Sequence, residues 1–321
     1  IGSINGGSPY VLIDGFPGDM NLVNPEDVES ISVLKDAAAS AIYGSRAPYG
    51  VILITTKNGK KNEKIAVTYS GAVMINSPQK LPESLDSYTY SRVQNEAGRN
   101  LGGTPMTEAA IDRMIAFQNK DWNELRRLMP HYPEGADITS GAYPNGDTWD
   151  SANRGYANND WWDILYGHSV NQKHDLSIQG GTEKASYYFS GGYLEQKGVL
   201  NYGNDVFRRI NLLGKVNIAI SDFWDFSWET RFAQKYRERS SSWNGAYYTN
   251  AFKYMTRWLY PFSPLYDGWG NISRASMIPF ILSGNEQTKH LDYWNNFRME
   301  IRPVKGWKIN ADFAYNTQSL N

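Results

Sequence analysis

From residue 65 onward, apolar and polar side chains alternate along long stretches of the chain. Ile210 and Leu212, for example, alternate with Arg209 and Asn211. Successive side chains of a β-strand point to opposite faces, so this period of two indicates strands with one apolar and one polar face. The pattern predicts seven strands, at residues 65–76, 174–180, 186–193, 207–220, 226–238, 290–302 and 307–317.

The connections between these strands run long, short, medium, short, long and short in chain order. Short ones occur at Gly181–Ala185, Ser221–Asp225 and Pro303–Gly306, whereas the connections 77–173 and 239–289 are long. Outer-membrane barrels are built with tight periplasmic turns and long extracellular loops. A soluble β-sandwich shows the same side-chain alternation but has no reason to sort its loops in this way. The lengths therefore favour a mainly β fold, a transmembrane antiparallel β-barrel. Seven strands cannot close such a barrel, so we expect it to be partial here.

Residues 1–60 differ in kind, because their elements are short. Asn24 is followed by Pro25, a pair that favours the start of a helical turn. Gly44 is a natural end for an Ala-rich helix. The unit is predicted to be a small α/β domain with elements at Tyr10–Ile13 (strand), Asp14–Asp19 (turn), Ser30–Leu34 (strand), Lys35–Tyr43 (helix) and Val51–Thr56 (strand).

Composition narrows the class of protein. Lys and Arg total 32 against 33 Asp and Glu, and this balance argues against a nucleic-acid partner. No apolar run is long enough for a transmembrane helix. Aromatic residues make up 14% of the chain, which suits the interfacial girdles of a membrane barrel. The chain begins with neither Met nor a signal pattern, so we expect residue 1 to be an interior point of a longer protein.

Four segments near the start of the chain resemble the plug of SusC/RagA-like TonB-dependent outer-membrane transporters. They are Tyr10–Asp19, Asn24–Ala37, Ala41–Ala47 and Gly50–Lys57. Asp160-Trp161-Trp162 and His174–Lys184 resemble an early hairpin of the family's barrel. We expect the motif residues of the plug to serve folding rather than ligand contact; they are Asp14, Gly15, Lys35, Asp36, Tyr43, Gly44, Arg46 and Gly50.

The resemblance implies a domain organisation and a function. Residues 1–60 would form the C-terminal part of the plug, and residues 61–321 the first seven or so strands of a barrel that the family builds from 22 strands. The residues 77–173 and 239–289 would be extracellular loops. The complete protein would import an oligosaccharide or peptide across the outer membrane of a Gram-negative bacterium of the Bacteroidota. TonB and a SusD-like surface lipoprotein would be its partners, and it would need no cofactor.

Two alternatives remain at this point. One is a TonB-dependent receptor for siderophores or cobalamin, which the sequence of the plug motifs disfavours. The other is a soluble, secreted glycan-binding or glycan-cleaving β protein, which the aromatic residues and carboxylates would suit.

Motifs of enzymes and metal sites are not apparent. The chain has no phosphate loop, nucleophile elbow or His-Glu-x-x-His pair. Its four histidines are scattered, and His174 is expected at the start of a strand. Asp14 and Asp19 are better explained by turn chemistry than by calcium binding. Glu26 and Asp27 suit the first turn of a helix better than glycoside cleavage. We therefore predict no catalytic residues and no bound metal.

The connection 239–289 is rich in aromatic residues interleaved with Asn, Ser and Gly. Flat aromatic faces beside amides suit stacking on sugar rings or gripping a peptide, although packing within an ordered loop is the more common reason for such residues. The candidates for ligand contact are Trp243, Tyr247, Tyr248, Trp258, Tyr266 and Trp269.

Overall fold

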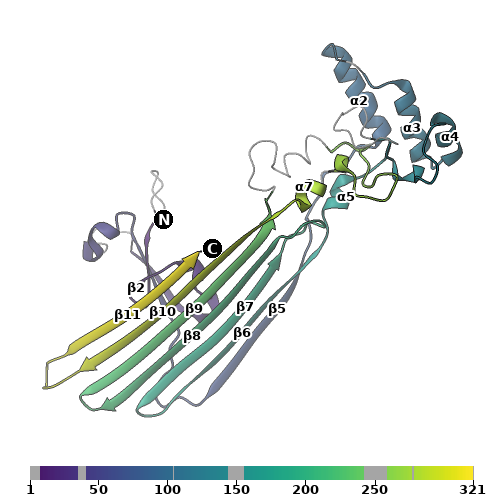
Figure 1. Ribbon diagram of the computed structural model, residues 1–321. Coiled ribbons are helices and arrows are strands. Elements are labelled where there is room, and N and C mark those ends of the chain that lie inside the picture. Colours follow the sequence, from purple (N-terminus) through teal and green to yellow (C-terminus); the bar gives the residue numbers. More distant parts are fainter. Residues whose placement is uncertain are drawn as a thin grey trace.

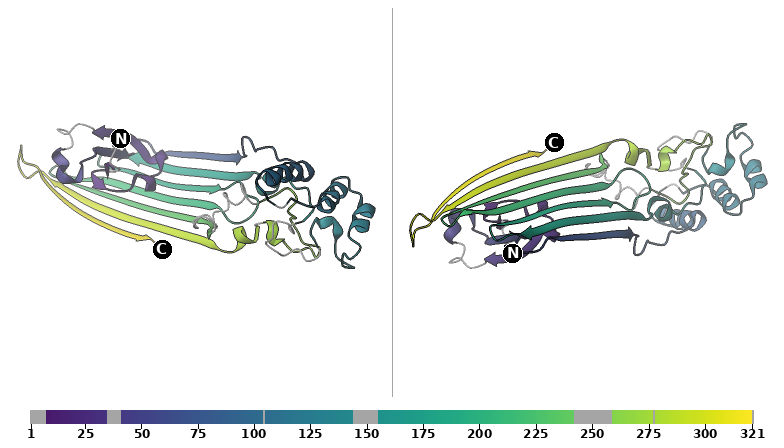
Figure 2. Two further views of the ribbon diagram at one scale, coloured as in Figure 1. Left: turned by 90° about the horizontal axis from the view of Figure 1, so that it is seen from above. Right: turned by 90° about the horizontal axis from the view of Figure 1, so that it is seen from below.

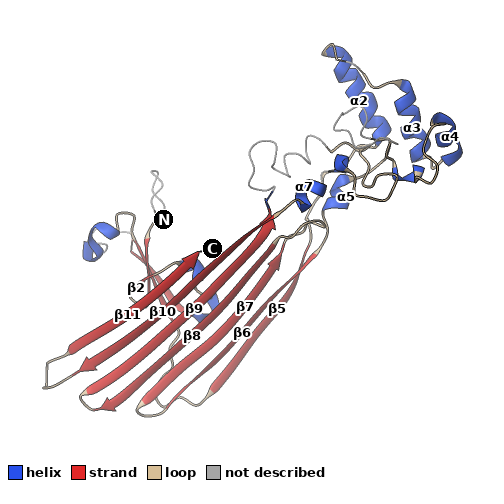
Figure 3. Cartoon of the chain, viewed as in Figure 1, coloured by secondary structure: helices blue, strands red, loops and turns tan. Residues whose placement is uncertain are grey.

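The computed structural model describes residues 8–34, 41–103, 105–143, 155–241, 259–276 and 278–320, whose strands form two separate sheets (Figures 1 and 3). The smaller sheet has the order β2-β1-β4-β3. Its strands are β1 (Tyr10–Ile13), β2 (Phe16–Pro17), β3 (Val28–Leu34) and β4 (Val51–Thr56). The larger, antiparallel sheet runs in chain order through β5 (Ala66–Asn76), β6 (Ser169–Gly181), β7 (Ala185–Lys197), β8 (Val206–Ser221), β9 (Trp224–Ser240), β10 (Asn285–Ile301) and β11 (Ile309–Leu320).

All seven strands predicted from the alternation are present, but several are longer than predicted. β6 begins at Ser169 and β10 at Asn285, in stretches where polar residues obscure the alternation. Backbone pairing continues through these stretches, because a ladder of hydrogen bonds does not depend on the polarity of the side chains. The prediction that His174 starts a strand is therefore wrong. It lies inside β6, between Gly71 and Tyr193 on the neighbouring strands.

The predicted sorting of the connections is confirmed. Residues 182–184, 222–223 and 302–308 form short turns at one end of the larger sheet (Figure 1). The connections 77–168 and 241–284 both emerge at the opposite end. The sheet therefore has a turn end and a loop end, as strict up-and-down pairing of neighbouring strands requires.

The two faces of the larger sheet differ in chemistry. One face is apolar and exposed, with Val67 63% and Phe313 66% accessible to solvent. The other face carries polar residues such as Asn211 and Lys215, and the smaller sheet lies against it (Figure 2). We call this second face the inward face. An exposed apolar surface of this width indicates that a second apolar phase covers it.

The smaller sheet is held by a tight hairpin and a parallel pair. Asp14 and Gly15 join β1 to β2 with φ angles of 49° and 91°, values that an Asp-Gly turn of type I′ requires. β1 pairs in parallel with β4, which pairs antiparallel with β3. Leu12 and Val51 are buried between the strands. Two turns of 3-10 helix, Met20–Leu22 and Pro25–Asp27, connect β2 to β3.

The two long connections fold together into a helical unit at the loop end, which we call the headpiece (Figure 1). Its core joins Leu125 and Tyr156 of the first connection to Phe262 of the second. A second cluster places Trp161 against Ile278. The helices of the headpiece are α2 (Ser87–Asn100), α3 (Glu108–Gln118), α4 (Trp122–Leu128), α5 (Trp161–Leu165) and α7 (Ile278–Leu282).

Throughout the described part of the chain, the helices are too short or too polar to cross a membrane.

Leu125→Ala is expected to loosen the headpiece without affecting the sheet. Leu125 is fully buried, so its truncation leaves a cavity and should lower the local free energy of unfolding by about 2–5 kcal/mol. Hydrogen exchange of the amides of α3 and α4 would measure the change. Leu101→Ala is the matched control, because Leu101 is 88% exposed. Equal exchange in the two variants would contradict the assigned core.

Candidate functional site at the seam between the two sheets

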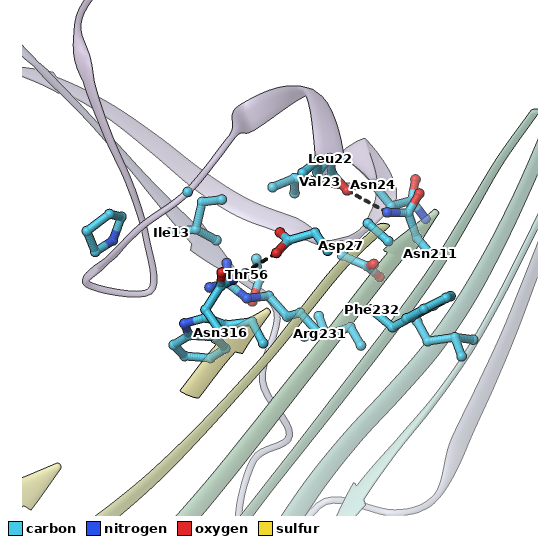
Figure 4. Close-up of a pocket in the computed structure, with 17 residues that line it drawn as sticks. Ile13, Leu22, Val23, Asn24, Asp27, Thr56, Asn211, Arg231, Phe232 and Asn316 are labelled. Atoms are coloured by element: carbon cyan, nitrogen blue, oxygen red, sulfur yellow. Dashed lines mark hydrogen bonds between the residues drawn. The ribbon is translucent and has the colours of Figure 1, made fainter. Parts of the chain in front are cut away.

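The candidate site is the seam where the smaller sheet and its connecting turns meet the inward face of the larger sheet (Figure 2). Asn211 of β8 donates from Nδ2 to the backbone oxygen of Leu22 at 2.5 Å (Figure 4). Asn24 donates from Nδ2 to Oδ1 of Asp175 on β6 at 2.7 Å. Both bonds are buried, and both join residues more than 150 positions apart in the chain.

Asn24 holds its position through the local sequence. Its Oδ1 accepts a hydrogen bond from the backbone N–H of Glu26 at 3.3 Å and so caps the 3-10 turn that begins at Pro25. The other end of the same amide is then free to reach Asp175. Gly192 leaves the space for this contact, because a Cβ at that position would lie 2.6 Å from Nδ2 of Asn24. One amide therefore fixes the local turn and joins it to the larger sheet.

Two adjacent carboxylates in this turn are engaged across the seam in different ways. Glu26 is half exposed and accepts a bond from Nζ of Lys173 at 2.7 Å, which lowers its pKa. Asp27 is buried, and this burial raises its pKa although Tyr188 donates its hydroxyl to Oδ1 at 3.0 Å. Each carboxylate has a structural partner on the larger sheet, so the geometry gives no support to a glycosidase pair.

Asp14 is the centre of a buried polar cluster. Its Oδ1 accepts from the backbone N–H of Thr56 at 2.9 Å, and its Oδ2 accepts from the Thr56 hydroxyl at 2.6 Å. Nζ of Lys215 lies 3.2 Å from Oδ2, and the side chains of Lys215 and Asp14 are only 8% and 10% exposed. Burial alone would raise the pKa of Asp14, but Lys215 and the bonds from Thr56 outweigh it and hold this pKa below its ordinary value.

A tilted aromatic contact adds to the polar seam. Phe16 of β2 packs on Trp294 of β10 with the ring centroids 4.8 Å apart. Arg231 of β9 places its guanidinium 4.1 Å from the centroid of the same indole. The small hairpin is thus attached to β8 by the ion pair of Asp14 with Lys215 and to β10 by the contact of Phe16 with Trp294.

The seam is not closely packed. A hollow of about 440 Å³ lies beside Asp14 and Lys215, and a smaller cavity of about 40 Å³ lies between Asp27, Asn211 and Arg231 (Figure 4). Along the same seam, Oδ1 of Asn296 is buried without a hydrogen-bond partner, and Oε1 of Glu229 and Nε of Arg231 face each other at 3.6 Å as an ion pair but form no hydrogen bond. Polar groups of this kind are paired by water in most proteins. The smaller sheet therefore contacts the larger one through a polar and incompletely packed interface.

The residues of the plug motif are spread over the smaller sheet. Asp14 does more than the turn prediction assigned to it, because it also binds Lys215. Gly44, with φ 58° and ψ −142°, is a non-helical break within the 3-10 segment Ala41–Arg46, and most of the helix predicted before it lies outside the described residues. Lys35 and Asp36 fall outside the described residues. The remaining motif residues lie near the small core (Tyr43), at the turn of β1 and β2 (Gly15), at the end of the 3-10 segment (Arg46) and before β4 (Gly50).

Sequence reasoning missed the residues of the larger sheet that hold the seam. Asp175, Tyr188, Asn211 and Lys215 all lie at inward positions within long strands. In the sequence, each of these residues is visible only as a polar residue within a predicted strand. That pattern does not distinguish a residue that binds the plug from one that faces water.

The aromatic candidates for ligand contact are not tested by the geometry. Tyr266 and Trp269 are 44% and 62% exposed on the headpiece. Tyr260 and Phe262, from the same connection, instead stack on each other and pack in the headpiece core. The other candidates, Trp243, Tyr247, Tyr248 and Trp258, lie outside the described residues.

Lys215→Met is expected to destabilise the seam strongly. The substitution leaves the carboxylate of Asp14 buried without its cation, and loss of one partner of a buried pair costs about 3–5 kcal/mol. Thermal unfolding of the full-length protein would report the loss. Lys235→Met serves as the control, since Lys235 is 3.8 Å from the more exposed Asp19. A loss no larger than that of the control would contradict the assigned role.

Asp14 should also give the seam an acid-sensitive component. Its pKa in the folded protein is lower than the ordinary value of 3.8, so its contribution is fully present above that value. The contribution is lost as the pH falls through the lowered pKa of the folded state, which places the fall in stability below about pH 4. Melting temperatures measured between about pH 3 and pH 6 should fall less steeply in Asp14→Asn than in the wild type. Asp19→Asn should keep the wild-type slope, and a wild-type slope in Asp14→Asn would count against the cluster.

Comparison with known proteins assigns the chain to a family. The family described as the TonB-dependent receptor plug domain matches residues 1–51. The TonB-dependent receptor SusC of Bacteroides thetaiotaomicron is 32% identical over 227 residues, which are 68% of this chain and 17% of SusC. The TonB-dependent receptor P26 of Formosa agariphila is 26% identical over 326 residues, which are 97% of this chain and 28% of P26.

The fold is similar to that of the RagAB peptide importer in its "open-open" state, with a TM-score of 0.70 and 23% sequence identity. The match covers 98% of this chain and 35% of the chain of the importer. The chain thus spans less than a third of the curated relatives and about a third of the solved structure. Sequence and fold agree, and the chain belongs to the SusC/RagA-like TonB-dependent receptors, a family of receptors and transporters rather than enzymes.

Proposed function

We propose that the complete protein imports a nutrient, an oligosaccharide or a peptide, actively across the outer membrane of a Gram-negative bacterium of the Bacteroidota. Residues 1–60 act as the C-terminal part of the plug, and residues 61–321 form the first strands of the barrel wall. The observation that carries the proposal is the seam, in which a plug-like unit is attached to the inward face of a β-wall by polar contacts. An interface of this kind can separate and re-form, whereas a dry apolar core would not.

The outward face supports the location in a membrane. On β8 the outward positions from Ile220 to Ile210 are apolar except for Gly214, and the next outward position is Arg208. At about 3.3 Å per residue and a tilt of about 45°, this stretch has a height of about 23 Å. The apolar band of outer-membrane barrels is about 25 Å tall. In this arrangement the headpiece lies on the extracellular side and the short turns on the periplasmic side.

The energy source and partner follow from the same proposal. The outer membrane has no ATP, so displacement of the plug requires force from the inner membrane, which TonB would transmit. The headpiece would meet a SusD-like lipoprotein that covers the extracellular opening. The similarity to SusC and to the RagAB importer supports this arrangement.

The two rival functions make different predictions. A siderophore or cobalamin receptor would work without a lipoprotein partner, so copurification of a SusD-like protein in mild detergent favours the nutrient importer. A soluble glycan-binding protein would be extracted without detergent, an outcome that the wide exposed apolar face makes unfavourable.

Crosslinking the plug to the wall would test the proposal. Asn217 of β8 donates to Oδ1 of Asn58 at 2.9 Å, and the chain has no cysteine of its own. In the full-length protein, oxidation of the double variant Asn58→Cys/Asn217→Cys should stop nutrient-dependent growth, and a reductant should restore it. Each single variant should grow as the wild type does under both conditions. Normal import by fully crosslinked protein would show that the plug does not need to move at this point.

A further inference from the structure

The inward face becomes strongly basic on the headpiece side of the seam. Arg209 of β8 lies directly opposite Lys235 of β9, and Arg237 occupies the next inward position on β9. We call these three residues the basic wall. The following inward position holds Arg239, which is paired with Glu286 at 3.1 Å. The basic wall thus begins at the edge of the seam and continues toward the headpiece.

Contacts with the smaller sheet fix the direction in which the basic wall points. Lys235 has Nζ 3.8 Å from Oδ2 of Asp19, which belongs to the turn after β2. Arg209 is two residues from Asn211, whose side chain binds Leu22, so both lie on the inward face. Arg208, which precedes Arg209, points outward and forms an ion pair with Glu195 at 2.6 Å.

Two of the three charges of the basic wall, those of Arg209 and Arg237, have no ion-pair partner among the described residues, whereas Lys235 has Asp19. Like charges directly opposite each other on paired strands destabilise a sheet, so the repulsion between Arg209 and Lys235 lowers the stability of the fold. Nε of Arg209 is buried without a hydrogen-bond partner. Within the described ranges, neither Arg209 nor Arg237 forms an ion pair.

The nearest acids to Arg209 already have other partners. Asp175 accepts from Asn24 and lies 3.3 Å from Nζ of Lys173. Asp27 accepts the hydroxyl of Tyr188. Both bonds attach the plug to the wall, so these carboxylates are committed to the seam. A cation that has no ion-pair partner among the described residues and that faces the compartment above the plug suits an anionic ligand from outside.

We propose that the basic wall recognises carboxylate groups on the imported molecule, so that the cargo is an acidic oligomer. This inference rests on the proposed import function and adds its substrate class. Guanidinium groups bind carboxylates through two parallel hydrogen bonds, and arginine is desolvated more easily than lysine. Acidic residues of a peptide and uronic acid units of an oligosaccharide present the same chemistry, and the experiment separates these two sources.

The test uses the full-length protein in detergent and two matched pairs of probes. One pair is a glutamate-rich peptide and its glutamine analogue; the other is an oligogalacturonate and its methyl ester. We expect the wild type to bind the acidic member of at least one pair about tenfold more tightly. This is the difference in affinity that one hydrogen bond to a charged group provides. Which pair shows this preference identifies the source of the carboxylates, and the preference should weaken as salt is added.

Variants of the basic wall make the result specific. Arg209→Gln/Arg237→Gln should lose the preference for the acidic probe, and Arg209→Lys/Arg237→Lys should retain most of it. Arg208→Gln is the matched control, because it removes a neighbouring arginine that faces outward. The inference is overturned if no acidic probe is preferred by the wild type, or if the glutamine double variant keeps the preference.

The two proposals fail in distinguishable ways. Uptake of the neutral probes that depends on TonB, without any preference for charge, would overturn the acidic cargo and leave the import function standing. Cells in which the protein supports no TonB-dependent uptake of any nutrient would overturn the import function itself.

Discussion

The structure depends on one constraint: each long strand must satisfy two different environments with alternate side chains. The outward positions hold apolar groups such as Val67, Leu212 and Phe313, because hydrocarbon offers no hydrogen bonds to a polar group. All polar chemistry is consequently confined to the inward positions. The seam is polar for this reason, since the smaller sheet can only meet the face that faces away from lipid.

This confinement also explains why the seam combines specificity with loose packing. Asn24, Asp14 and Asp27 each find a particular partner on the larger sheet, and the alignment of the two sheets is thereby defined. Buried polar contacts contribute little net free energy compared with apolar packing, because both partners lose their hydration. The attachment is therefore accurate in position and modest in strength.

The sequence predicts the larger sheet well and the seam poorly. Alternation is a local property, so all seven strands and the sorting of their connections follow from the chain alone. Strand ends were misplaced where polar residues continue the ladder, as at Asn285. The partners of Asp14 and Asn24 lie more than 150 residues away, and no local pattern records that Lys215 or Asp175 would face them. The turn at Asp14 was predicted, but its contact across the seam was not.

The shared core of the headpiece constrains how its two insertions can evolve. Phe262 comes from the second connection and packs among residues of the first, including Leu125 and Tyr156. Recombination that exchanged only one of these insertions with a relative would leave half of a core without its complement. Diversification of the headpiece should therefore proceed by joint inheritance of both insertions, although the four strands β6 to β9 separate them in the gene.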